Sequence, residues 1–75
     1  MTEEQKKELE GQINYYSYKS AFCKSLKETQ LVRCYEGRMW AVIEALSILG
    51  YKAQKYTYSD FGGVVYDMYK IVEKN

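Results

Sequence analysis

This sequence of 75 residues predicts an all-α fold, a three-helix bundle in which a shorter C-terminal helix lies against a long antiparallel helical hairpin. Three observations lead to this prediction. Proline, the strongest helix breaker, is absent from the chain. The length suits a single domain, residues 1–75. The third observation is an apolar stripe at steps of three and four residues, formed by Val32, Tyr35, Met39, Val42, Leu46 and Leu49.

The first helix is expected from about Glu3 to Lys27. Thr2 and Gln5 have the spacing of a capping box, in which two side chains satisfy backbone N–H groups of the first turn. Apolar positions then recur at helical spacing along two neighbouring stripes. These stripes are Leu9, Ile13, Tyr16, Ser20 and Cys23, and beside them Tyr15, Lys19, Phe22 and Leu26.

The central helix is expected to follow a turn at residues 27–30, with Thr29 as its N-cap and Gly50 as a left-handed C-terminal cap. This turn makes a hairpin that sets Cys23 against Cys34. The alternative is one continuous rod of ~70 Å, which would leave both apolar faces in water. A second apolar stripe means that the central helix needs covering on two sides; it consists of Leu31, Cys34, Ala41, Ala45 and Ile48.

The segment after the central helix is harder to assign. Residues 51–58 have the aromatic and β-branched content of a strand, but one short strand without a partner is unstable. We therefore expect an extended connector or irregular helix there. Ser59 or Asp60 then caps a last helix, whose first turn is weakened by Gly62 and Gly63. Its apolar face is formed by Phe61, Val64, Val65, Met68, Ile71 and Val72.

The small size and the abundance of tyrosine predict association with another chain. A core of this size rarely supplies more than about 3–5 kcal/mol without a disulfide, a metal or a second subunit. Nine residues are Tyr, whose hydroxyl groups suit half-buried positions and interfaces better than a dry interior. We therefore expect a homo-oligomer or a protein partner.

The residue types present argue against an enzyme. Histidine is absent, which removes the commonest general base and any mixed Cys/His zinc site. Cys23 and Cys34 are expected to be reduced, packed residues, with a disulfide or redox pair across the hairpin as the alternative. We therefore expect no catalytic residue, no metal and no cofactor. The chain shows neither a membrane span nor a signal sequence, so a cytoplasmic location is expected.

Two sets of surface residues are candidates for binding. Aromatic and arginine side chains are enriched in protein-binding hot spots. Such residues fall in the first half of the central helix, and the candidate contact patch is Arg33, Tyr35, Glu36, Arg38 and Trp40. Basic side chains near the hairpin turn form a second candidate set for phosphate or nucleic acid. This set is Lys19, Lys24, Lys27 and Arg33.

The central helix resembles one found in small phage and mobile-element proteins of low-GC Gram-positive bacteria. The matching residues are Cys34-Tyr35-Glu36-Gly37-Arg38 and Ala45-Leu46-Ser47-Ile48-Leu49-Gly50-Tyr51, a YxG…ALxxLGY pattern. The resemblance covers about residues 2–51. It implies an inhibitor of a bacterial defence system, such as an anti-CRISPR, that binds a host protein or sequesters a nucleotide signal.

The function expected from the sequence is therefore non-catalytic binding of a host protein, which blocks a bacterial defence or regulatory complex. Two alternatives remain open. One is the capture of a phosphorylated ligand or nucleic acid at the basic tip of the hairpin. The other is a self-associating structural bundle.

Overall fold

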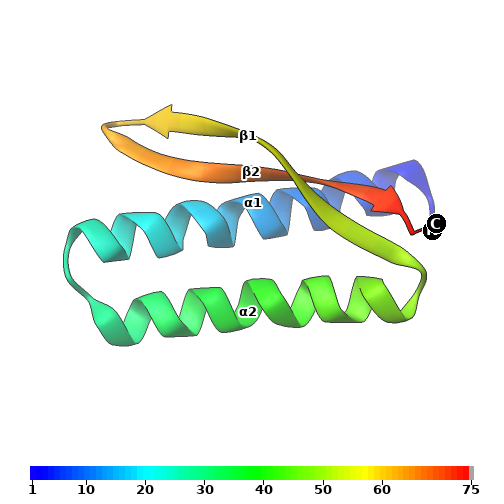
Figure 1. The fold of residues 1–75 in the computed structure, drawn as a ribbon, viewed down its shortest axis with the longest axis horizontal. Helices are drawn as coiled ribbons and strands as arrows, with labels where there is room; N and C mark the ends of the chain where they lie inside the picture. Colours follow the sequence, from blue (N-terminus) through cyan, green and yellow to red (C-terminus); the bar gives the residue numbers. More distant parts are fainter. Residues whose placement is uncertain (75) are drawn as a thin grey trace.

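The computed structural model describes residues 1–74 and contains two helices followed by two strands. Helix α1 spans Glu3–Ser25 and helix α2 spans Thr29–Ile48; strand β1 spans Tyr51–Phe61 and strand β2 spans Val64–Glu73. The helices form an antiparallel hairpin, and the strands form a two-stranded antiparallel sheet beside it (Figure 1). The fold is therefore α+β, and the prediction of an all-α three-helix bundle is wrong.

The helical hairpin agrees with the sequence pattern. The Thr2 side chain accepts a hydrogen bond from the Gln5 N–H, and the Gln5 side chain accepts one from the Thr2 N–H, so the capping box is confirmed. Between the helices the chain turns at Lys27, which has a positive φ of 60°. The N-cap of α2 is Glu28, which makes no side-chain capping bond, so the prediction that Thr29 is the cap is wrong.

The C-terminal third forms a β-hairpin in place of a connector and a helix. Gly62 and Gly63 join β1 to β2, and both have positive φ, 61° and 83°. Two consecutive residues with positive φ are the requirement of a type I′ turn, whose twist matches that of the flanking strands. The sheet register is interrupted once, at a bulge between Lys55 and Thr57.

The sheet stands with one edge on α1. The Asn14 side chain accepts a hydrogen bond from the Tyr69 N–H and donates one to the Tyr69 carbonyl, at 2.8 and 3.1 Å. Glu10 Oε1 accepts from the Ile71 N–H at 2.7 Å, and Ser17 Oγ donates to the Asp67 carbonyl at 2.7 Å. Polar side chains one helical turn apart thus satisfy the outer edge of β2, as a third strand would.

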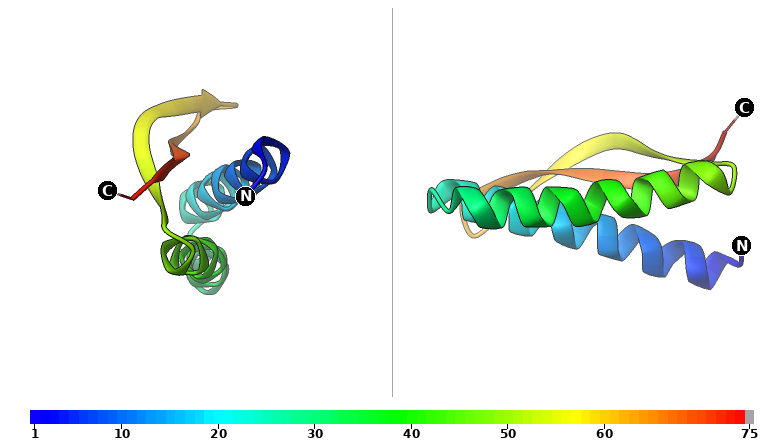
Figure 2. Two further views of the ribbon diagram at one scale, coloured as in Figure 1. Left: turned by 90° about the vertical axis from the view of Figure 1, so that its right-hand side faces the viewer. Right: turned by 90° about the horizontal axis from the view of Figure 1, so that it is seen from below.

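The core lies where α1, α2 and β2 meet. It contains Ile13 from α1, Met39 and Leu46 from α2, and Ile71 from β2. Seen end-on, α1, α2 and the sheet lie at three corners around this core (Figure 2). Partly buried side chains pack around it, namely Leu9, Tyr16, Val42, Ile43, Tyr51, Ala53 and Tyr69.

The two apolar stripes of α2 have different fates. Val32, Met39 and Leu46 of the main stripe are buried, whereas Leu49 at its end is exposed. The second stripe is uncovered along its whole length, and Ile48 is 83 % exposed. Its other members, also exposed, are Leu31, Cys34, Ala41 and Ala45. The structure thus covers α2 on one side only.

A groove between helix α2 and strand β2

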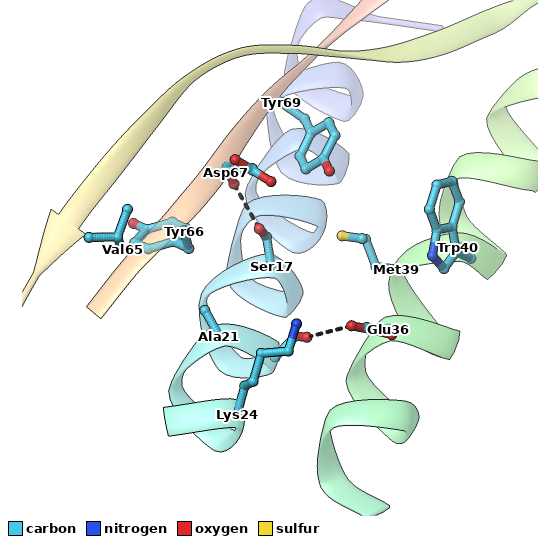
Figure 3. A pocket seen from close by; sticks show the side chains of 11 residues that line it. Ser17, Ala21, Lys24, Glu36, Met39, Trp40, Val65, Tyr66, Asp67 and Tyr69 are labelled. Carbon is cyan, nitrogen blue, oxygen red and sulfur yellow. Dashed lines mark hydrogen bonds between the residues drawn. The ribbon is translucent and has the colours of Figure 1, made fainter. Parts of the chain in front are cut away.

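A groove of about 470 Å³ runs between α2 and β2, with α1 as its floor (Figure 3). It exists because β2 rests on α1 by its edge and stands apart from α2. The lining side chains come from all three elements: Ser17, Ser20, Ala21 and Lys24 from α1, Glu36, Met39 and Trp40 from α2, and Val65, Tyr66, Asp67 and Tyr69 from β2.

The floor of the groove is polar but already hydrogen-bonded. Ser17 and Ser20 are both buried small residues of α1. Ser17 donates to the backbone of β2 at Asp67, and Ser20 donates to Glu36 Oε1 of α2 at 3.3 Å (Figure 3). These two bonds tie α1 to both walls. Because the hydroxyl groups are occupied, the floor offers a ligand little unsatisfied polarity.

The walls carry large apolar side chains, and two of these side chains are exposed to solvent. Trp40 on α2 is 58 % exposed and Val65 on β2 is 57 % exposed. Met39 and Tyr69 line the groove from the same two elements and are more deeply buried. A large, rigid indole at the rim of a groove with apolar side chains on both walls is the kind of side chain that dominates protein interfaces.

Charged groups sit at the ends and rim of the groove. Lys24 and Glu36 lie at one end, and Asp67 lies on the β2 wall. Asp67 forms an ion pair of 3.1 Å with Lys55 of β1. The hydrogen bond to Asp67, and then the charge of that carboxylate, raise the pKa of Lys55 above its ordinary value. The groove thus carries both signs of charge and no concentrated field.

The predicted contact patch is divided between two sides of α2. Glu36 and Trp40 line the groove. Tyr35 and Arg38 lie on the other side, where the Arg38 guanidinium stands 5.9 Å from the centre of the Tyr35 ring. The Tyr35 ring in turn packs 6.4 Å from that of Tyr16 on α1. Arg33 is exposed near the start of α2.

The predicted basic set is likewise spread over the hairpin. Lys19 lies over the rings of Phe22 and Tyr35, at 5.6 and 5.8 Å. Lys24 and Lys27 line a smaller hollow at the hairpin tip, whose other lining residues are Glu28, Thr29 and Val32. Phosphate binding by these cations and Arg33 stays a prediction.

The two thiols differ in environment. Cys23 is buried, whereas Cys34 is exposed on the outer face of α2, and both are free. The expectation that both lie on packed faces is therefore wrong for Cys34. Among residues 1–74, no group of three or more Cys, Asp or Glu side chains could hold a metal ion. Neither helix of this part of the chain is long and apolar enough to cross a membrane.

Comparison of this chain with protein-family models, curated proteins and solved structures gives no match. The groove must therefore be interpreted from its own geometry.

Several residues of the groove were missed by sequence reasoning. Val65 and Tyr69 were expected in a helix, and Ser17 was given no role. One signal was available: Glu10, Asn14 and Ser17 repeat at helical spacing beside the core stripe, which is unusual for a face that should pack on another helix.

Proposed function

We propose that this protein is a non-catalytic binding module that holds an amphipathic helix of another protein in the groove between α2 and β2. The carrying observation is Trp40, an exposed indole beside a groove whose two walls both carry apolar side chains. Val65 lines the same groove from β2, so an apolar side chain inserted there would contact apolar groups on both walls. Interfaces are commonly anchored by such a central aromatic contact.

A helix suits the groove better than an extended peptide. An extended peptide gains affinity by pairing its backbone with a free strand edge. The edge of β2 nearest the groove floor is already satisfied by Glu10, Asn14 and Ser17. A helix satisfies its own backbone and binds through an apolar stripe, which is what the groove walls can receive.

The class of target rests on the resemblance of α2 to helices of phage and mobile-element proteins. We propose that the bound helix belongs to a bacterial defence or regulatory complex in the cytoplasm, and that occupation of the groove blocks that complex. The support for this part is the YxG…ALxxLGY pattern of residues 35–51.

The test compares two exposed apolar residues on α2. Trp40 borders the groove, while Ile48 lies on the outer face of the same helix. Tagged wild-type, Trp40→Ala and Ile48→Ala proteins are used to capture partners from a low-GC Gram-positive host. We expect one partner that the Trp40 variant loses and the Ile48 variant keeps. The reverse pattern would place binding on the outer face and contradict the groove.

The chain contains a single tryptophan, so Trp40 reports directly on its own contact. A peptide copying a helix of the captured partner should shift the Trp40 emission to shorter wavelength. Binding of this peptide should persist at moderate salt concentration. Binding that instead weakens steeply with rising salt would indicate phosphate or nucleic acid as the ligand.

A further inference from the structure

We infer that the outer face of α2 is a self-association surface, on which α2 of a second copy of this chain packs antiparallel to form a dimer. This face is the one that points away from α1 and the sheet. It is defined by Cys34, Gly37, Ala41, Ala45 and Ile48, all of which are exposed.

The first observation is the apolar character of this face. Cys34, Ala41 and Ile48 are spaced by seven residues, which places them one above another along the helix. Ile48 is 83 % exposed, and no charged side chain lies among the five residues of the face. A solvated helix face normally carries charged or polar residues, so an apolar strip of this length indicates a contact.

The charges beside the strip identify the occupant as a second copy. Arg33 and Glu44 lie on the same side of the strip, Arg33 in the N-terminal half of α2 and Glu44 in the C-terminal half. When two identical helices pack antiparallel about a twofold axis, residues on the same side of the strip face each other. With the twofold axis between residues 38 and 39, the middle of α2, Arg33 of each copy meets Glu44 of the other, which gives two ion pairs per dimer.

Arg38 lies on the other side of the strip. Its guanidinium stands 5.9 Å from the centre of the Tyr35 ring, which directs this charge away from the strip.

The test is sedimentation equilibrium of the full chain over a range of micromolar concentrations. Wild type should show a monomer–dimer equilibrium. Ala41→Glu places a charge at the centre of the strip and should raise the dimer dissociation constant at least about tenfold, since an unpaired charge buried in an interface is costly. The matched control is Gln12→Glu, which adds the same charge to an exposed position on α1 and should leave the dimer intact.

Orientation is tested by a charge exchange. Arg33→Glu and Glu44→Arg should each weaken the dimer, because each creates two like-charge contacts. An equimolar mixture of these two variants should associate again, since position 33 of one variant and position 44 of the other then carry opposite charges at both contacts. Circular dichroism should show the same helicity for all variants. A wild type that stays monomeric, an Ala41→Glu protein that dimerises normally, or a mixture that fails to associate would each overturn the inference.

Discussion

Leu46 is one of three large side chains that are fully buried in this small domain, together with Ile13 and Ile71. It comes from α2, is 2 % exposed, and packs with Ile13 and Ile71 at the junction of three elements. Leu46→Ala should lower the free energy of unfolding by about 2–5 kcal/mol, a large part of the total for a domain of this size. Urea denaturation followed by circular dichroism measures the loss. At a protein concentration below that of dimer formation, Ile48→Ala on the exposed face should change it by less than about 0.5 kcal/mol.

The ion pair of Lys55 and Asp67 predicts a pH dependence of known sign. Asp67 raises the pKa of Lys55 in the folded protein, so the pair stabilises the fold fully below the unfolded pKa of about 10.4. This contribution is lost as the pH rises through the folded pKa. Asp67→Asn should therefore return the Lys55 pKa toward its ordinary value, as measured by NMR titration of the side chain. An unchanged pKa would show that the pair does not persist in solution.

The residue pattern of α2 correctly predicted buried side chains on the side of the helix that the rest of the protein covers. The buried series Val32, Met39 and Leu46 could be predicted because its spacing matches a helix packed along one line. Leu49 could not, because its exposure depends on where the chain leaves the helix at Gly50. Trp40 was predicted as part of a contact patch, but its place beside a groove could not be predicted without the position of β2.

At the scale of elements, the β-hairpin was misread for a physical reason. Because β2 stands on α1 by its edge, both of its faces are partly covered: Ile71 packs into the core, while Tyr66 on the other face packs 5.2 Å from Tyr18. The apolar residues therefore do not alternate strictly, and their spacing fits a helix as well as a strand. The decisive signal was Gly62-Gly63, a two-residue hairpin turn between two β-rich segments.

The contact between α1 and β2 gives a prediction at this scale. Asn14→Ala leaves both backbone groups of Tyr69 without partners at a part-buried position. We expect a loss of about 1–3 kcal/mol in the free energy of unfolding. The amide of Tyr69 should also exchange faster with deuterium than in wild type. Gln12→Ala, at an exposed position on the same helix, is the control and should leave both measurements unchanged.

The two edges of the sheet are protected in different ways. The outer edge of β2 is satisfied by α1 from the Asp67 carbonyl to the Ile71 N–H, so this stretch cannot recruit another strand. The edge of β1 faces solvent, but it carries Lys52 and Lys55 and is interrupted by the bulge before Thr57. Lysines and bulges are features that discourage edge-to-edge pairing. Association through the outer face of α2 is therefore better supported than association through the sheet.

At the scale of the whole molecule, the helical hairpin could be predicted from the sequence, but the β-hairpin that packs against it could not. Helix periodicity, the capping box and the positive φ of Gly50 are local properties, and the structure agrees with them. The choice between a third helix and a β-hairpin depends on long-range hydrogen bonds such as those of Asn14 with Tyr69. The groove exists only because a β-hairpin forms, so the residues that line it could not be predicted from the sequence.

The shared core predicts that the helical hairpin and the β-hairpin unfold together. Ile71 contributes to this core from β2, whereas Cys23 is buried near the far end of α1. In a Cys34→Ser background, Cys23 is the only thiol, and its alkylation rate under native conditions reports the opening of the helices. Ile71→Val should lower the free energy of unfolding by about 0.5–1.5 kcal/mol. If the molecule opens as one unit, Cys23 should be alkylated about twofold to tenfold faster.

In the complementary Cys23→Ser protein, studied at low concentration, the exposed Cys34 should react at the same rate with and without Ile71→Val. If Ile71→Val left the alkylation rate of Cys23 unchanged, the helices would open alone, and the sheet would be a separate unfolding unit.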